Sequence, residues 1–190
     1  MGLTESCTGR VILVIGGGSS GKSAAALSLA GGETPQAFVA TGQALDEEMA
    51  VRIARHQRER GSLWETIEVP VKLEQWFLAN GHTYRTIVLD CLTLWLSNLR
   101  EHGVPDEQIP EFVHALLRAM RTSRARVVVV TNELGLGLIP MEGSARGFRD
   151  LAGKANQLCA GEADEVYFIV SGMSIQMKPD QHVNRVRIIR

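Results

Sequence analysis

Short runs of apolar and β-branched residues alternate along the chain with longer segments in which apolar residues recur every three or four positions. The short runs have the length of buried strands, and the longer segments have the spacing of amphipathic helices. Such alternation predicts an α/β fold in which helices cover a mostly parallel sheet. The predicted strands are 11–15, 37–41, 64–69, 86–90, 126–131, 165–170 and 174–178. The predicted helices are 22–30, 46–60, 73–80, 92–102, 106–123 and 145–161.

The end of the chain departs from this alternation. Only a short turn, "SGM", separates the strand at 174–178 from the preceding strand, so the two are predicted to form an antiparallel hairpin. The segment 179–190 leaves two alternatives open, a further strand or a flexible tail. No internal repeat and no linker rich in proline, glycine or serine marks a boundary, so residues 1–190 are expected to form one domain.

Composition narrows the possible classes of function. Of the 190 residues, 45% are hydrophobic and 22% are charged, which is typical of a compact globular protein. The formal net charge of −1 provides no overall positive field, so nucleic acid is not an expected partner. The early apolar run "VILVI" is too short to cross a bilayer, and membrane insertion is not expected. Cys7, Cys91 and Cys159 form no CxxC pair, which disfavours a disulfide framework or zinc site and fits a reducing cytoplasm.

The segment "VILVIGGGSSGKS" at residues 11–23 contains the pattern G-x-x-x-x-G-K-[ST], directly after a predicted strand and before a predicted helix. This is the context of a P-loop, whose backbone N–H groups surround phosphate oxygens at a helix N-terminus. Lys22 is expected to reach the β and γ phosphates, and the Ser23 hydroxyl is expected to ligate Mg²⁺. The predicted nucleotide-binding loop comprises Gly16, Gly17, Gly18, Ser19, Ser20, Gly21, Lys22 and Ser23.

Two acidic residues stand where predicted strands end. Asp90 ends the strand at 86–90, and we predict that it holds Mg²⁺ opposite the P-loop. The alternative is that Asp90 is the N-cap of the following helix. Glu133 lies in "TNELGLGLIP", after another strand, and is either an acid/base or metal-side group in a substrate-facing loop or part of a structural connection.

The segment "DEEMAVRIARHQRERG" places His56 among arginines on the predicted helix at 46–60. At 3.6 residues per turn, Arg52 and Arg60 share a face with His56, whereas Arg55 and Arg58 point elsewhere. Flanking cations lower the pKa of a histidine, and a neutral imidazole is a nucleophile that could attack the α phosphorus of a nucleotide. Helical spacing alone leaves the alternative of a structural or solvated histidine open.

With these residues, the chain resembles the bifunctional adenosylcobinamide kinase / adenosylcobinamide-phosphate guanylyltransferase family of cobalamin biosynthesis. The resemblance runs from about Val11 to Lys178. It rests on the P-loop and on "ATGQALDEEMAVRIARHQRERGSLWETIE", "LDCLTLWLSNL", "VVVVTNELGLGLIP" and "FRDLAGKANQ". It implies a P-loop NTPase (RecA-like) three-layer sandwich of about seven strands, one of them antiparallel, and assembly as a homotrimer.

The resemblance also implies two reactions and the residues that perform them. ATP or GTP first phosphorylates adenosylcobinamide; GMP then passes from GTP, through the guanylylated His56, to adenosylcobinamide phosphate, giving adenosylcobinamide-GDP and pyrophosphate. The residues implied around the guanine nucleotide are Ala40, Thr41, Gly42, Gln57, Arg58, Glu59, Arg60, Glu68 and Asp90. The alternatives are a P-loop small-molecule kinase without guanylyltransferase activity and a non-catalytic nucleotide switch.

Some positions differ from the family pattern or have two interpretations. Ser19 and Ala24 stand where the family loop "GGARSGKSR" has arginines, and Met141 and Ser144 replace the usual Glu and Leu. In "FRDLAGKANQ" and the residues just before it, the basic side chains either meet phosphate or form a solvated helical face. These side chains are Arg146, Arg149 and Lys154. The three tryptophans, Trp64, Trp76 and Trp95, are expected in the core or at trimer contacts rather than as a platform for the corrin ring.

Overall fold

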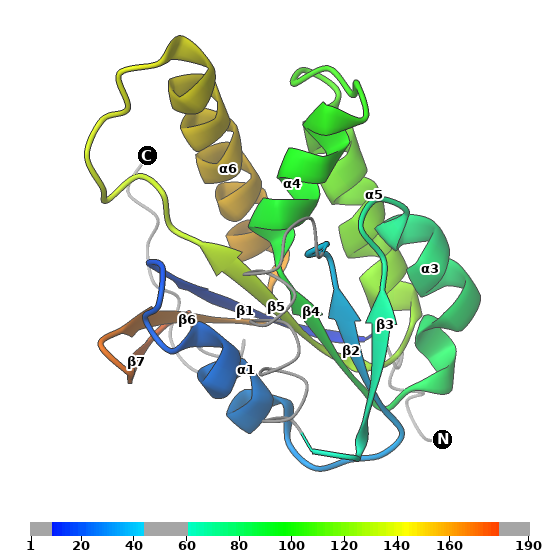
Figure 1. Ribbon diagram of the computed structural model, residues 1–190. Helices are drawn as coiled ribbons and strands as arrows, with labels where there is room; N and C mark the ends of the chain where they lie inside the picture. Colours follow the sequence, from blue (N-terminus) through cyan, green and yellow to red (C-terminus); the bar gives the residue numbers. More distant parts are fainter. Residues whose placement is uncertain (1–8, 44–60, 179–190) are drawn as a thin grey trace, which may run out of the picture.

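The computed structural model describes residues 9–43 and 61–178, and within them seven strands form one sheet (Figure 1). The strand order is β3-β2-β4-β5-β1-β6-β7. All neighbouring pairs are parallel except β6 and β7, which are antiparallel as predicted. The strands are β1 (Arg10–Gly16), β2 (Gln36–Ala40), β3 (Trp64–Glu68), β4 (Thr86–Asp90), β5 (Arg126–Asn132), β6 (Glu165–Val170) and β7 (Met173–Lys178).

Helices cover both faces of this sheet, but the described helices are divided unevenly between the two faces. Among the described helices in Figure 1, only α1 lies on one face, and α3, α4, α5 and α6 lie on the other. The helices are α1 (Lys22–Ala30), α3 (Leu73–Asn80), α4 (Leu92–Glu101), α5 (Ile109–Thr122) and α6 (Gly143–Glu162), with a 3₁₀ turn at Gly81–Thr83. The described part therefore has the predicted α/β architecture of helix, sheet and helix layers.

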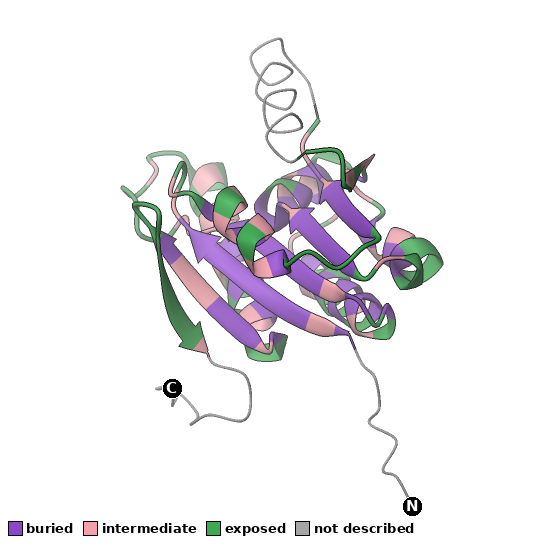
Figure 2. Ribbon diagram, turned by 90° about the horizontal axis from the view of Figure 1, so that it is seen from below, coloured by how far each residue is buried: buried purple, intermediate pink, exposed green. Residues whose placement is uncertain are grey.

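The central strands are buried on both faces, which explains why they read as continuous apolar runs rather than as alternating ones. Along β1, Val11 and Leu13 belong to the larger core under α3 to α6, whereas Ile12 and Val14 pack with Ala26 of α1. In Figure 2 the central strands are buried and β7 at the sheet edge is exposed.

The predicted element bounds agree with the structure to within a few residues. The largest difference is at α5, which begins at Ile109 rather than at 106. Backbone hydrogen bonds from Gln108 N to the Pro105 carbonyl and from Ile109 N to the Asp106 carbonyl form a turn ahead of the helix. Helix α6 begins earlier than predicted, at Gly143 instead of 145. The predicted helix at 46–60 and the segment 179–190 lie outside the described residues.

Candidate active site

Strand register brings several predicted site residues to one edge of the sheet. Ala40, at the end of β2, pairs with Glu68 of β3 on one side and with Asp90 of β4 on the other. Gly16 and Asn132 pair in the same way at the ends of β1 and β5. Because neighbouring strands lie about 4.8 Å apart, residues distant in sequence share this carboxyl edge, where ligands bind in open α/β sheets.

The glycine-rich loop leaves β1 at Gly16 and enters α1 at Lys22, as predicted. Gly16 has no room for a side chain, since a Cβ there would lie 2.3 Å from the carbonyl oxygen of Ile169. Gly21 has a φ of 97°, in the left-handed region that favours glycine. A Cβ at Gly17 or Gly18 would meet nothing within 4 Å, so this part of the loop presents backbone to open space. Such a loop at a helix N-terminus has the features of a phosphate-binding cradle.

Two backbone hydrogen bonds from other elements hold the loop. The Glu133 N–H, just after β5, donates to the Gly16 carbonyl at 2.9 Å. The Gly172 N–H, in the turn between β6 and β7, donates to the Ser20 carbonyl at 2.9 Å. The buried Lys22 Nζ donates to the Gly17 carbonyl, which keeps the amino group over the loop. The loop is therefore anchored at its start and near its end.

Ser23 and Asp90, predicted from separate motifs, are in direct contact. The Ser23 hydroxyl, in the first turn of α1, donates to Asp90 Oδ2 at 2.8 Å. A hydroxyl and a carboxylate oxygen are hard ligands suited to Mg²⁺, which typically completes its shell with water and phosphate oxygens. The described residues contain no group of three or more His, Cys, Asp or Glu side chains that could hold a metal by themselves. The pair fits a metal bound together with a nucleotide.

The alternative role of Asp90 as a helix N-cap is wrong. The N-cap of α4 is Cys91, whose Sγ accepts from the Leu94 N–H at 3.4 Å. Burial, together with the neighbouring Asp90 charge, raises the pKa of the Cys91 thiol to about 12, so the thiol is neutral at physiological pH. Cys91 is therefore a structural cap.

Thr41 fixes the chain at the end of β4. Its Oγ1 donates to the Cys91 carbonyl at 2.7 Å and accepts from the Cys91 N–H at 2.8 Å, while its own N–H donates to the Asp90 carbonyl at 3.1 Å. The buried Asn98 amide in turn donates to the Thr41 carbonyl at 2.9 Å. The contacts of Thr41 are thus with backbone that positions Asp90. Gly42 follows, where a Cβ would contact Leu94.

The loop between β5 and α6 contains the other predicted acid. Glu133 Oε1 accepts from the Gly135 N–H at 2.7 Å, so its carboxylate closes a local turn. Arg146 donates to the carbonyls of Pro140 and Met141, at 3.0 and 2.6 Å, and ties the far end of this loop to α6. These contacts support a structural role for both side chains. The acid/base or metal-side role of Glu133 stays a prediction.

The remaining basic residues and the tryptophans lie in separate places. Lys154 is exposed on α6, which fits a solvated face, whereas the Arg149 side chain is only 22% exposed and pairs with Asp150 at 3.8 Å. Trp95 is in the core and donates from Nε1 to the Val71 carbonyl at 2.7 Å, as expected. Trp76 stacks on Tyr84, and Trp64 meets Phe38 edge to face.

Sequence reasoning missed one buried residue beside the P-loop, Asn156. Asn156, inside the motif "FRDLAGKANQ", is 5% exposed and hydrogen-bonds to the end of β5. Its position in an apolar helical stripe, four residues after the buried Ala152 and three before the buried Cys159, could have signalled this burial. The predicted nucleophile His56 and Gln57, Arg58, Glu59 and Arg60 lie outside the described residues.

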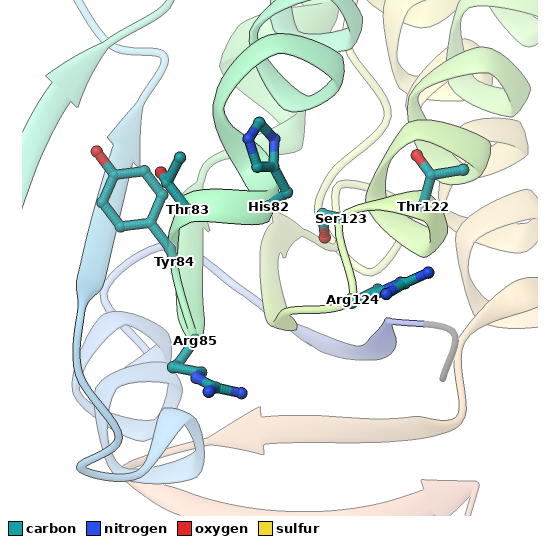
Figure 3. A pocket seen from close by; sticks show the side chains of 7 residues that line it. All are labelled: His82, Thr83, Tyr84, Arg85, Thr122, Ser123 and Arg124. Atoms are coloured by element: carbon teal, nitrogen blue, oxygen red, sulfur yellow. The ribbon is translucent and has the colours of Figure 1, made fainter. Parts of the chain in front are cut away.

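A groove of about 680 Å³ lies away from these residues. It is formed between the segment leading into β4 and the segment leading into β5, at the edge opposite the P-loop (Figure 3). It contains none of the predicted site residues. The lining residues are His82, Thr83, Tyr84, Arg85, Thr122, Ser123 and Arg124.

Among the helices of the described segments, none is long and apolar enough to span a membrane.

Known proteins with similar sequences share nearly the whole chain. The bifunctional adenosylcobalamin biosynthesis protein CobU of Escherichia coli (strain K12) is 36% identical over 180 residues, covering 88% of this chain and 99% of the relative. The bifunctional adenosylcobalamin biosynthesis protein CobP of Pseudomonas aeruginosa is 36% identical over 167 residues, covering 87% of this chain and 96% of the relative.

A solved structure and a family comparison complete the assignment. The P4 protein from bacteriophage phi6, in complex with ADP, has a TM-score of 0.51 at 14% identity. The match covers 92% of this chain and 56% of that chain, and it shows a shared fold. Residues 12–177 match the family described as cobinamide kinase / cobinamide phosphate guanyltransferase, and the chain belongs to that family.

Proposed function

We propose that this member of the cobinamide kinase / cobinamide phosphate guanyltransferase family phosphorylates adenosylcobinamide at the P-loop and then transfers GMP to the product through His56. The observation that carries the kinase half is the contact between Ser23 and Asp90 at the end of an open glycine loop. Two motifs far apart in sequence thereby supply the phosphate cradle and the metal-side acid in one place.

In the kinase reaction, a hydroxyl oxygen of the substrate attacks the γ phosphorus of ATP or GTP, ADP or GDP leaves, and the hydroxyl proton is released to solvent. The loop N–H groups hold the phosphates, and Lys22 leaves the Gly17 carbonyl to reach the β and γ oxygens. Ser23 and Asp90 would hold Mg²⁺, which supplies positive charge against the phosphate oxygens when bound. Positioning of the reactants and neutralisation of phosphate charge account for most of the rate enhancement in such reactions.

In the guanylyl transfer, a neutral His56 nitrogen attacks the α phosphorus of GTP, and pyrophosphate leaves. A phosphate oxygen of adenosylcobinamide phosphate then attacks the same phosphorus, which breaks the P–N bond and releases the histidine. Arg52 and Arg60, on the same predicted face as His56, would stabilise charge on the group in transfer. The edge position of Ala40 and Glu68 beside Asp90 supports a nucleotide contact there.

Incubation with α-labelled GTP tests the covalent step. We expect label on the wild-type protein that is labile in acid and stable in alkali, and no label on His56→Ala. His114→Ala is the matched control, because His114 is an exposed histidine on α5. A wild type that turns over cobinamide phosphate without label would contradict the proposal. A His56→Ala variant that retains kinase activity locates the defect in the second reaction, whereas a wild type with only kinase activity favours the simple kinase.

The helical-face argument is tested by the arginines. Arg52→Ala or Arg60→Ala should slow the appearance of label more than Arg55→Ala does, because only the first two share the face of His56. Quenched-flow measurement of labelling at saturating GTP gives the three rates. Equal rates for the three variants would contradict the argument.

The quaternary structure and compartment form part of the same proposal. We propose a homotrimer in the cytoplasm, where nucleoside triphosphates are available. Free thiols at Cys91 and Cys159 support a reducing compartment.

Two exposed groups of apolar side chains support self-association. The first group, in the loop after β5, contains Leu136, Leu138, Ile139 and Met141; the second, at the edge of the sheet, contains Val170, Met173, Ile175 and Met177.

A further inference from the structure

A closed ring of hydrogen bonds surrounds the last residue of β5, directly beside the P-loop. Three buried side chains take part, Thr93 of α4, Thr131 of β5 and Asn156 of α6. Asn156 Nδ2 donates to the Asn132 carbonyl at 3.0 Å, and the Asn132 N–H donates to Thr93 Oγ1 at 2.8 Å. Both polar groups of the Asn132 backbone are therefore bound by side chains from two helices that flank the carboxyl end of β5 (Figure 1).

The direction of every bond in this ring follows from its neighbours. The Asn132 carbonyl can only accept, so Asn156 must present its NH₂ there and its Oδ1 to Thr131, which donates at 2.8 Å. Thr131 has then used its hydrogen, so Thr93 is the donor across the 3.1 Å contact between the two hydroxyls. The ring runs from Asn132 N–H through Thr93, Thr131 and Asn156 back to the Asn132 carbonyl, and each hydroxyl donates once and accepts at least once. Such rings strengthen cooperatively in a buried environment.

The ring lies next to Gly16, the residue from which the phosphate loop leaves β1. Asn132 pairs with Gly16 across the β1–β5 ladder, and the next N–H along, that of Glu133, donates to the Gly16 carbonyl at 2.9 Å. Gly16 is thus packed against the Ile169 carbonyl and bonded through its own carbonyl to Glu133, so a shift of the Glu133 N–H would shift the start of the loop. We propose that Asn156 is a positioning residue: through the ring around Asn132 it fixes the origin of the P-loop and so the phosphate-binding geometry. This proposal rests on the proposed role of the P-loop in binding phosphate.

The test uses a ligand without a base, so that only phosphate binding is measured. Inorganic tripolyphosphate binding to the full chain is followed by calorimetry for wild type, Asn156→Ala and Ser123→Ala. Ser123 is the matched control because it is 4% exposed and its hydroxyl also bonds to backbone, to the Met120 carbonyl at 2.6 Å, but at the opposite end of β5. We expect about tenfold weaker binding for Asn156→Ala and a change of less than about twofold for Ser123→Ala, while thermal scans show comparable destabilisation of both.

Two further variants separate positioning from general loss of stability. Thr131→Val keeps the shape but removes the hydroxyl link, and should weaken tripolyphosphate binding as Asn156→Ala does; Thr131→Ser keeps the hydroxyl and should bind within about twofold of wild type. The double variant Thr131→Val/Asn156→Ala should bind no more weakly than either single variant, because both break the same ring. In steady-state assays the KM for the nucleotide should rise more than kcat falls.

The outcomes distinguish this proposal from the function on which it rests. If Lys22→Ala does not weaken tripolyphosphate binding, the P-loop is not the phosphate site and the proposed function fails first. If Lys22→Ala weakens it but Asn156→Ala and Ser123→Ala are indistinguishable, the positioning role is overturned and the P-loop assignment stands. Additive effects in the double variant would also overturn the ring mechanism.

Discussion

At the end of β4, two consecutive residues perform different tasks. Cys91 caps α4 through its sulfur and stays neutral, because burial raises the pKa of its thiol to about 12. Asp90 therefore does not serve the helix, and its carboxylate accepts from Ser23 instead. Because its thiol is neutral, Cys91 adds no negative charge beside the Asp90 carboxylate.

Substituting Asp90 by Asn tests the metal-side role at this position. Asp90→Asn preserves size and can still contact Ser23, but it removes the charge, so phosphorylation of cobinamide should slow by roughly 100-fold at saturating Mg²⁺ and nucleotide. Asp106→Asn is the control, because Asp106 pairs with Arg100 at 3.0 Å on the surface away from the loop. A kinase rate in Asp90→Asn equal to that of Asp106→Asn would exclude the metal-side role.

Sequence alone could predict these residues only in part. The P-loop spacing identified Ser23, but an Asp that follows a strand looks the same whether it binds a metal or caps a helix. The sulfur contact of Cys91 excludes the cap, and register places Asp90 at the edge of the sheet beside Ala40, whereas the metal-side role stays a prediction. Asn156 was missed because an asparagine among lysine, alanine and glutamine reads as a solvated helical residue, although the packing of α6 against β5 buries it.

At the scale of elements, the hairpin at the sheet edge supports the phosphate loop. The β6–β7 turn contains Ser171 and Gly172 with positive φ, and the Gly172 N–H holds the Ser20 carbonyl. A Cβ added at Gly21 would lie 3.4 Å from Gly172 Cα, so turn and loop are in close contact. The antiparallel strand β7 thus does more than extend the sheet, since its turn braces the loop near the start of α1.

A pair of glycine substitutions separates this brace from ordinary backbone strain. Gly172 and Gly103 have φ of 77° and 80°, and a Cβ at either would meet nothing within 4 Å. Alanine at either site should therefore cost about 1 kcal/mol in the free energy of unfolding, because L residues are strained in this region. Only Gly172→Ala should also weaken nucleotide binding, by about threefold to tenfold, since only that turn contacts the loop. Urea unfolding and nucleotide titration measure the two effects, and equal affinities in both variants would contradict the brace.

Elements were predicted well where burial alone determines them. Strands β1, β4 and β5 are buried on both faces, so apolar runs revealed their position. The starts of α1, α3 and α4 were predicted correctly, but those of α5 and α6 were not. The start of α5 depends on local hydrogen bonds in the turn at Pro105 to Ile109, which periodicity does not encode. The contact between the β6–β7 turn and the P-loop could not be predicted, because it joins backbone groups about 150 residues apart and leaves no trace in side-chain pattern.

At the scale of the whole molecule, two segments of the described surface each expose several neighbouring apolar side chains. On the edge strand β7, Met173 and Ile175 are 65% and 55% exposed; in the loop after β5, Leu138 and Ile139 are 95% and 71% exposed. An exposed apolar edge strand is unfavourable in a monomer, because its unpaired N–H and C=O groups and its side chains invite association. A ring with threefold symmetry joins two different patches of neighbouring subunits, and in the proposed homotrimer we expect these two segments to form such a pair.

Mixing two complementary variants tests this arrangement. The wild type should have three times the mass of the chain in light scattering, whereas Met173→Ser/Ile175→Ser and Leu138→Ser/Ile139→Ser should each be monomeric, because each lacks one half of the interface. Mixed together, the two variants should form a dimer but no trimer, since one intact patch from each can still meet. Leu78→Ser, which changes a 58% exposed leucine on α3, should stay trimeric. A monomeric wild type would contradict the trimer itself. A trimeric wild type whose two variants do not combine would instead show that these patches do not face each other across a heterologous interface.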